Sequence, residues 1–177
     1  MSGEQGAWAE VWDTLRAVVI AVAVALLIRQ FVVETYQVKG ESMEPTLWNG
    51  ERVLVNKMAL RFGPPHIGEI IVFHPPLNTP DDFIKRIVAL GGQTVSMTAG
   101  NVYVNGQPQP EPYLPPSWRG HQTMAPVRVP AGDVWVLGDH RQYSEDSRIF
   151  GPVPVKSIQG VGMLVWWPPR NFRTLGG

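Results

Sequence analysis

A run of twelve residues without a polar side chain, Ala17–Ile28, limits what this chain can fold into more than any other feature. Arg29 interrupts the pattern, which then resumes as far as Val33. As a helix, the stretch 17–33 rises roughly 25 Å, close to the thickness of the hydrocarbon core of a bilayer. We therefore predict one transmembrane helix, with residues 1–35 forming an N-terminal tail and anchor.

A cleaved signal peptide is the alternative interpretation of this segment. The leader of a signal peptide should be positively charged, but here Glu4, Glu10 and Asp13 precede a single basic residue, Arg16. The small-residue pattern at 21–23 lies inside the apolar run, where a cleavage site does not belong. An uncleaved anchor fits the sequence better.

From Tyr36 onward the helical pattern gives way to short apolar stretches separated by glycine and proline. One of them, Val102–Val104, runs into Asn105-Gly106, a dipeptide typical of two-residue hairpin turns. Short strands with this turn spacing predict a mainly β fold, an antiparallel barrel-like domain. The strands are expected at residues 51–56, 69–73, 82–90, 102–104, 133–137 and 161–167.

The same patterns suggest how the chain is divided. Residues 108–130 are rich in proline and weakly patterned, so we expect them to leave the main sheet. We predict a β-rich domain over residues 36–170, within which residues 92–130 form a small insertion or cap. Residues 171–177 are expected to form a C-terminal tail.

Composition excludes several classes of protein and site. Fifteen basic and fifteen acidic side chains give a formal net charge of zero, and no basic stripe points to a nucleic-acid partner. The absence of cysteine excludes thiol proteases, zinc–thiolate sites and disulfide scaffolds. The histidines at positions 66, 74, 121 and 140 lack the spacing of paired metal ligands. We therefore expect no metal and no cofactor.

Three segments carry polar residues that a plain β-domain does not need. The first, Gly40–Leu47, places Ser42 in a tight loop between a glycine and Pro45. In such a loop the backbone N–H of the serine can face a ligand instead of a neighbouring strand. By its local pattern alone, the segment is equally compatible with an ordinary turn.

The second segment is the strand-like stretch 82–90, where Lys85 lies within an apolar run. Alternation places Lys85 on the same face as Phe83 and Ile87, where an ammonium group needs an anion or loses its proton. In the opposite phase, Lys85 is exposed and Arg86 is paired inward. The local pattern leaves both phases open.

The third segment, Gly138–Arg148, follows a predicted strand and is dense in polar side chains. Such a density suggests a hydrogen-bonded loop that holds a site in place. A solvated turn is the simpler alternative, and the segment alone does not decide between the two.

Together the three segments resemble the sequence boxes of the bacterial type I signal peptidase family, in the same order and behind an N-terminal anchor. Gly40–Leu47 matches G-x-S-M-x-P-T-L, Phe83–Arg86 matches Y/F-I-K-R, and Gly138–Arg148 is similar to G-D-N-R-x-x-S-x-D-S-R. The resemblance extends over residues 17–168. It implies a membrane-bound serine endopeptidase with a serine–lysine dyad that removes signal peptides from exported preproteins.

The resemblance implies a role for each matching residue. Ser42 is expected to be the nucleophile, with its own backbone N–H as one oxyanion-hole donor, and Lys85 the general base. Ser144 is expected to orient the lysine amine, while Asp146 and Arg148 form a supporting ion pair. The positions that line shallow pockets for small substrate side chains are expected at Val38, Met43, Leu47 and Ile84.

Three positions depart from the family pattern. Gly40 stands where some members carry a serine that completes the oxyanion hole, so the second donor of this chain is expected to be a backbone group. His140 replaces the usual asparagine of the third box, which leaves its role open. Gln93 replaces a common aspartate after the Gly91-Gly92 pair, which affects a structural contact and no catalytic one.

The chemistry of a serine–lysine pair depends on the pKa of the lysine. A free lysine, with a pKa of about 10.4, is protonated at neutral pH and cannot accept the serine proton. Burial beside apolar side chains lowers that pKa, so Lys85 can become a base. The alternative mechanism is a triad of Ser42 with His140 and either Asp139 or Asp146.

The resemblance also implies partners and a location. The expected substrates are the signal peptides of secreted preproteins, cut after small residues of the Ala-x-Ala type. We expect a monomer in the plasma membrane, single-pass, with the catalytic domain on the extracytoplasmic face and in contact with the lipid bilayer. Two alternatives remain: a non-catalytic, membrane-tethered β-domain that acts as an assembly factor, and a self-cleaving serine–lysine protease of the SOS repressor type.

Overall fold

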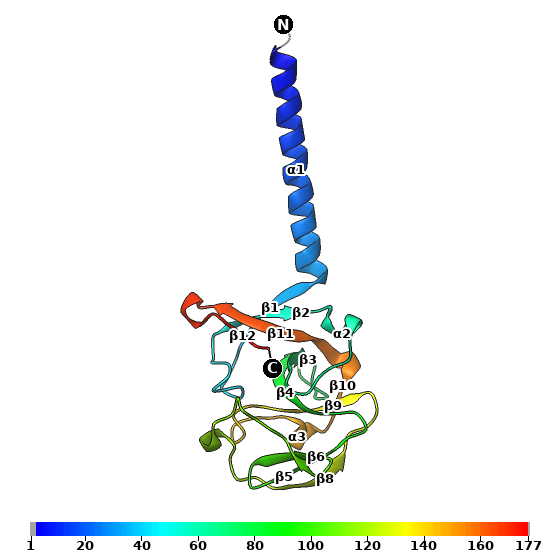
Figure 1. Cartoon of the computed structure of the whole chain (residues 1–177), viewed down its shortest axis with the longest axis vertical. Coiled ribbons are helices and arrows are strands. Elements are labelled where there is room, and N and C mark those ends of the chain that lie inside the picture. Colours follow the sequence, from blue (N-terminus) through cyan, green and yellow to red (C-terminus); the bar gives the residue numbers. More distant parts are fainter. Residues whose placement is uncertain (1–2, 177) are drawn as a thin grey trace.

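The computed structural model describes residues 3–176, apart from the side chains of residues 3–11 and 27–31. A single long helix, α1 (Gly3–Phe31), projects away from a β-domain that contains the rest of the described chain (Figure 1). The C-terminus lies within the β-domain, far from the free end of the helix.

The helix ends earlier than the apolar pattern of 17–33 suggests. It stops at Phe31, and Val33 already begins strand β1 (Val33–Gln37). The apolar side chains of the described middle of α1 are exposed on all sides, including Leu15, Val19 and Leu26. Within the part of the chain whose side chains are described, no helix is long and apolar enough to cross a membrane. The predicted span lies partly outside this part, because it includes residues 27–31.

The larger sheet is antiparallel throughout and has eight strands. Seven follow one another in the order β1-β2-β11-β3-β4-β9-β10, and β12 pairs with β11. Among the described residues its end strands, β1 and β10, do not pair with each other, so the sheet is curled but open. After β1, its strands are β2 (Arg52–Asn56), β3 (Ile70–Phe73), β4 (Phe83–Leu90), β9 (Asp133–Leu137), β10 (Val153–Pro154), β11 (Ile158–Trp167) and β12 (Arg173–Thr174).

The mainly β, antiparallel prediction is therefore confirmed, and the structure refines the predicted barrel to an open, half-barrel sheet. The smaller sheet, of four strands in the order β7-β6-β5-β8, falls inside the predicted insertion 92–130. The Asn105-Gly106 turn joins two of its strands and has positive φ at both residues, 53° and 77°. These strands are β5 (Thr94–Thr98), β6 (Asn101–Val104), β7 (Gln107–Pro108) and β8 (Met124–Arg128).

Short helices connect the strands, and the end of the chain joins the larger sheet. The sequence predicts a tail over 171–177, but Arg173–Thr174 form β12 and Leu175 packs into the core. The reason is a buried partner: Glu51 accepts hydrogen bonds from the guanidinium of Arg173. The short helices are α2 (Ala59–Phe62), α3 (Ser147–Phe150), η1 (Pro116–Trp118), η2 (Val155–Ser157) and η3 (Pro169–Asn171).

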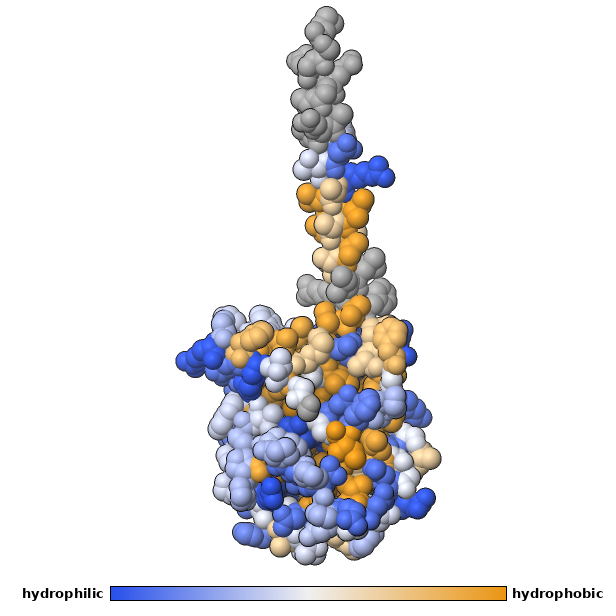
Figure 2. All heavy atoms as spheres, in the orientation of Figure 1, coloured by the Kyte–Doolittle hydropathy of each residue, from blue (hydrophilic) through white to orange (hydrophobic). Residues whose placement is uncertain are grey.

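Apolar side chains form three buried clusters. One lies between β2, β3, β11 and the segment that follows β1, another between β4, β9 and the smaller sheet, and a third around Phe73 and Ile87. Strand β4 contributes to all of them, because both of its faces are buried. Figure 2 shows further apolar side chains around the middle of α1 and on the part of the β-domain next to the helix.

Candidate active site

The loop that carries Ser42, residues 40–47 (the serine loop), is anchored by its apolar members. Met43 and Leu47 are fully buried in the first core cluster, and the N–H of Leu47 donates to the carbonyl of Met43 at 2.8 Å. Gly40 opens the loop with a φ of +83°, a conformation that glycine adopts without strain. Between these anchors Ser42 is half-buried, so its hydroxyl can be reached while its backbone is fixed.

Lys85 lies on β4 with its side chain pointing at the serine loop. Its Nζ donates to Ser42 Oγ at 2.7 Å and lies 5.2 Å from the centre of the Phe83 ring. Only 4% of Lys85 is exposed, so the phase that places this lysine in solvent is wrong. Burial lowers the pKa of Lys85 to about 8, although the charges of Asp146, Glu145 and Asp139 raise it in part.

The next residue on β4, Arg86, is as deeply buried as Lys85 but is fully paired. Its guanidinium donates to both carboxylate oxygens of Asp139, at 3.0 and 2.8 Å, and to the carbonyl of Gly68 at 2.7 Å. The hydroxyl of Thr46 donates to the same Asp139 carboxylate at 2.5 Å. Strand β4 is thus fixed to the serine loop through Asp139.

The polar segment 138–148 (the site loop) is an ordered, hydrogen-bonded loop. Asp146 is completely buried, accepts from the backbone N–H of Gly138 at 2.9 Å and caps α3. Its carboxylate is also paired with Arg148, which donates from Nε and Nη2 at 2.7 Å each. The interpretation of this segment as a solvated turn is therefore wrong.

Ser144 is close to the reacting groups but is not bonded to them. Its Oγ is buried without a hydrogen-bond partner and packs against Gly138. A side chain at Gly138 would overlap both Ser144 and the carbonyl of Ser42, so only glycine allows these loops to approach. The predicted contact between Ser144 and the amine of Lys85 is absent from this structure.

His140 contacts the backbone of the serine loop and not the serine hydroxyl. Its backbone N–H donates to the carbonyl of Ser42 at 3.0 Å, and its ring Nδ1 lies 3.3 Å from the carbonyl of Glu41. The ring is held edge-on by Trp118 and Tyr143. A triad base must bond to the nucleophile, so this arrangement does not favour the histidine mechanism.

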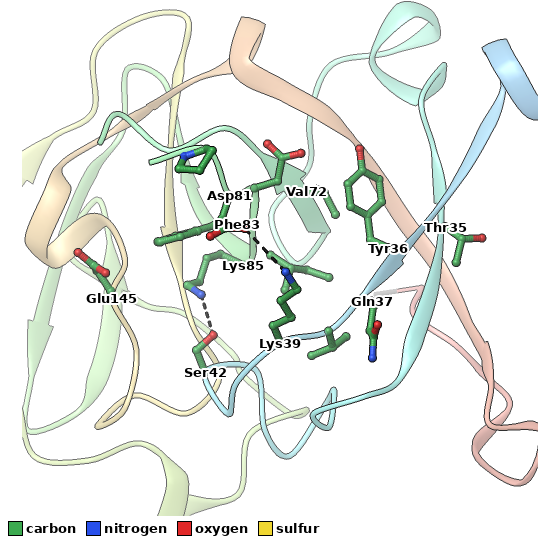
Figure 3. Close-up of a pocket in the computed structure, with 14 residues that line it drawn as sticks. Thr35, Tyr36, Gln37, Lys39, Ser42, Val72, Asp81, Phe83, Lys85 and Glu145 are labelled. Atoms are coloured by element: carbon green, nitrogen blue, oxygen red, sulfur yellow. Dashed lines mark hydrogen bonds and ion pairs between the residues drawn. The ribbon is translucent and has the colours of Figure 1, made fainter. Parts of the chain in front are cut away.

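A cavity of about 580 Å³ opens beside Ser42 and Lys85 (Figure 3). One wall is the segment Thr35–Lys39, the other is the segment Pro80–Lys85, and Glu145 lies at the end near the two reacting groups. Val38 and Ile84, two of the four positions predicted to bind substrate, line this cavity. Met43 and Leu47 do not line it, because both are buried in the core beneath the loop.

Two departures from the family pattern have structural explanations. The amide of Gln93 accepts from the backbone N–H of Leu90 at 2.7 Å and so closes the turn between β4 and β5. The N–H of Gly40 donates to the side chain of Asn49 at 3.1 Å, which leaves it bonded within the protein.

Several residues that stabilise the site were not predicted from the sequence. Besides its bonds to Glu51, Arg173 donates to the carbonyl of Thr46 at 2.5 Å and so holds the serine loop from the C-terminal side. Glu111 and Arg141 form a buried ion pair between residues 109–123 and the site loop. A charged residue in a weakly patterned segment was the only available signal, and it does not identify the partner.

Known proteins share both the sequence and the fold. Residues 11–167 match the family described as signal peptidase, peptidase S26. The chain is 39% identical to a probable signal peptidase I-1 of Synechocystis, over 96% of this chain and 89% of that protein. It is 36% identical to a signal peptidase I of Bacillus amyloliquefaciens, over 92% and 88%.

A solved structure supports the same relationship. The crystal structure of a signal peptidase I from Enterococcus faecalis aligns with a TM-score of 0.50 at 32% identity, covering 56% of this chain and 97% of that one. The chain belongs to the signal peptidase family, peptidase S26, whose members are serine endopeptidases that remove signal peptides.

Proposed function

We propose that this chain removes signal peptides from exported preproteins with Ser42 as nucleophile and Lys85 as general base. The observation that carries the proposal is the 2.7 Å contact between Ser42 Oγ and the Nζ of Lys85, which forms no ion pair with a carboxylate of the described residues. A buried amine in this position loses its proton more readily than a solvated one. It can then take the proton of the Ser42 hydroxyl that it contacts.

In the proposed mechanism, Lys85 carries one proton from Ser42 to the leaving group. Neutral Lys85 accepts the proton of Ser42 Oγ as the oxygen attacks the carbonyl carbon of the scissile peptide bond. The resulting ammonium then donates that proton to the leaving nitrogen, which departs as the amine of the mature protein. Water attacks the acyl–enzyme ester in the second half of the cycle, with Lys85 again as the base, and Ser42 recovers its proton.

The negative charge of the tetrahedral intermediate needs donors that are already in position. The N–H of Ser42 has no acceptor among the described residues, so it is available for the oxyanion. The N–H of Gly40 is engaged by Asn49, which makes it a weaker candidate for the second donor.

The walls of the cavity suggest how a preprotein binds. Strand β4 pairs with β9 only from Arg86 onward, so the edge of residues 83–85 that faces the cavity is unpaired among the described residues. An extended peptide can add to such an edge through backbone hydrogen bonds. Val38 and Ile84 then present a shallow apolar surface, which suits cleavage after small residues of the Ala-x-Ala type.

The site loop supplies the support in this mechanism. Asp146 and Arg148 fix the backbone around Ser144 by a buried ion pair. Ser144 stays the residue that we propose to orient the amine of Lys85 during the reaction, although its buried hydroxyl does not contact that amine in this structure. Met43 and Leu47 act on the substrate only indirectly, because they hold the serine loop from below.

The N-terminal helix is the basis for the proposed membrane location of the protein. The apolar run Ala17–Ile28 and the exposed apolar side chains around α1 support a single-pass anchor in the plasma membrane. The β-domain, 36–170, then works at the extracytoplasmic bilayer surface, where the cleavage site of an exported preprotein emerges. We keep the division into anchor (1–35), catalytic domain and insertion (92–130), and a monomeric state, as part of the proposal.

A cleavage assay tests this proposal. The full chain in detergent is incubated with a peptide that carries an Ala-x-Ala site and with a matched peptide that carries bulky residues there. We expect cleavage after the second alanine of the first peptide only, and none by Ser42→Ala or Lys85→Met. Activity of the Lys85→Met variant would contradict the dyad, and equal cleavage of both peptides would contradict the proposed specificity.

A further inference from the structure

The segment between β7 and β8, residues 109–123 (the bracing segment), looks like an unstructured excursion in the sequence but contains a deeply buried carboxylate. Only 4% of Glu111 is exposed, and a buried carboxylate is costly unless it is paired. Its partner is Arg141 of the site loop, 1% exposed, which donates from both terminal nitrogens to the two carboxylate oxygens.

Arg141 connects Glu111 to the backbone of the site loop. Its Nε donates to the carbonyl of Gly138 at 3.0 Å. Gly138 is the position at which a side chain would not fit against Ser42. In the same turn, the N–H of His140 donates to the carbonyl of Ser42 at 3.0 Å. Glu111 is therefore linked through Arg141 to the backbone of Gly138, and the same turn, two residues further along, bonds Ser42 through the N–H of His140.

Tyr113 links the same segment to β4. Its hydroxyl donates to Glu111 at 3.1 Å, and the guanidinium of Arg86 lies over its ring, 3.7 Å from the ring centre. Burial raises the pKa of Tyr113, so the hydroxyl stays protonated and remains a donor. Arg86 is adjacent to Lys85, so the bracing segment touches the neighbours of both members of the dyad.

Two further contacts join the bracing segment to the site loop. Arg148 donates from Nη1 to the side chain of Gln122, and the ring of Trp118 packs edge-on against His140 with centres 4.4 Å apart. The segment thus meets the site loop near its middle and again at its end. Glu111 differs from Trp118 and Gln122 of the same segment in being both charged and buried.

We propose that Glu111, supported by Tyr113, is a positioning residue that holds the site loop and β4 so that Ser42 and Lys85 keep their reacting distance. The inference rests on the dyad proposed above. A buried ion pair is weak support for stability, because an apolar pair of similar volume often stabilises as well. What the ion pair adds here is direction: two parallel hydrogen bonds fix the orientation of Arg141 and, through it, Gly138.

The test separates positioning from stability by comparing variants in the full chain. Glu111→Gln removes the charge, while Met97→Ala creates a cavity at a buried residue of the smaller sheet that does not line the active-site cavity. Because a displacement of about 1 Å costs on the order of 100-fold in rate, we expect Glu111→Gln to lower kcat by about that factor with little change in KM. Met97→Ala should lower the unfolding midpoint and leave kcat unchanged.

A double variant sharpens the distinction. Glu111→Gln with Arg141→Met removes both charges, so we expect the unfolding midpoint to recover while kcat stays low. Glu111→Asp, which keeps the charge, should restore part of kcat. Should Glu111→Gln alone not fold, Tyr113→Phe keeps the ring beneath Arg86 and should still lower kcat several-fold.

Three outcomes would overturn the inference: kcat of Glu111→Gln no lower than that of Met97→Ala, recovery of kcat in the double variant, or unchanged kcat in Tyr113→Phe. Ser42→Ala and Lys85→Met are measured beside them. If those two retain activity, the dyad itself is wrong. If they are inactive and the Glu111 variants behave like the control, only the positioning role is wrong.

Discussion

Lys85 and Arg86 are neighbours on β4 and equally buried, with 4% and 3% of each exposed, but their surroundings are opposite. On the Arg86 side, the guanidinium is neutralised by the carboxylate of Asp139 and satisfied by the carbonyl of Gly68. On the Lys85 side, the amine contacts a hydroxyl and an aromatic ring and, among the residues that the structure describes, no carboxylate. One strand therefore holds a structural cation and a reactive amine side by side.

The difference shows how the fold divides two tasks between adjacent residues. The paired arginine stays charged at any physiological pH and fixes β4 to the serine loop. The unpaired lysine carries the cost of burying a charge, which lowers its pKa and makes it a base. Changing the surroundings or the side chain at one of the two positions should therefore affect either stability or catalysis and leave the other measurable.

We expect the largest effect on kcat from replacing Lys85 with arginine, so that positions 85 and 86 both carry a guanidinium. Lys85→Arg places a permanently charged group against Ser42, and a guanidinium cannot accept the serine proton. We expect kcat to fall by about 10⁴-fold, as for loss of a general base, with the fold retained. Peptide cleavage in detergent measures the loss, and circular dichroism checks the fold. Activity within tenfold of the wild type would mean that Lys85 is not the base.

Removing the anion on the other side should act on stability. Asp139→Asn leaves the buried guanidinium of Arg86 without its counter-charge, and breaking a buried ion pair costs about 3–5 kcal/mol. Denaturant unfolding of the full chain measures the change, with Asp133→Asn, a half-buried residue of β9, as the control. A loss no greater than that of the control would show that the pair does not hold the strand.

Lys85→Met should lose activity and gain stability. Because the pKa of Lys85 is about 8 when folded and about 10.4 when unfolded, the unfolded chain binds more protons between these values. The wild type is thus penalised below pH 8 and relieved as the pH rises toward 10.4. We expect the variant to be more stable by on the order of 3 kcal/mol at pH 7, with a smaller difference at pH 10. A difference that does not change with pH would contradict this expectation.

The smallest effect concerns Glu145, an exposed residue at the end of the cavity near Lys85. Its charge raises the pKa of Lys85, so Glu145→Gln should lower that pKa and shift the acid limb of the kcat profile to lower pH. Exposed charges couple weakly, by about 0–1 kcal/mol, so the shift should be less than about one pH unit. A shift to higher pH, or no shift at low salt, would count against it.

How much of this could be predicted from the sequence differs between the fold and the site. The strands 51–56, 69–73 and 133–137 were predicted nearly to the residue, because glycine turns and apolar runs mark them locally. Strand β5, Thr94–Thr98, was missed although it alternates threonine and serine with apolar residues, the pattern of a half-buried strand. The tail was predicted wrongly because its anchor, Glu51, is distant in sequence.

At the site, the pairing of Ser42 with Lys85 could be expected only from the order of three sequence boxes. The local pattern of β4 could not decide whether Lys85 or Arg86 faces inward, because the strand is buried on both faces and each cation has its own surroundings. Glu111 was not predicted because a buried ion pair depends on which loops the tertiary fold brings together. The spacing of residues along the sequence does not show which loops will meet in the folded protein.

The most direct measurement is the titration of Lys85 itself by NMR, in the full chain with isotope-labelled lysine side chains. Lys85→Met assigns the signal, and the other lysines of the same sample serve as internal references. We predict that the Lys85 amine titrates with a pKa of about 8, below the pKa of about 10.4 of a lysine side chain free in water. A pKa of 10 or above for Lys85 would contradict its role as the base, whatever its distance from Ser42.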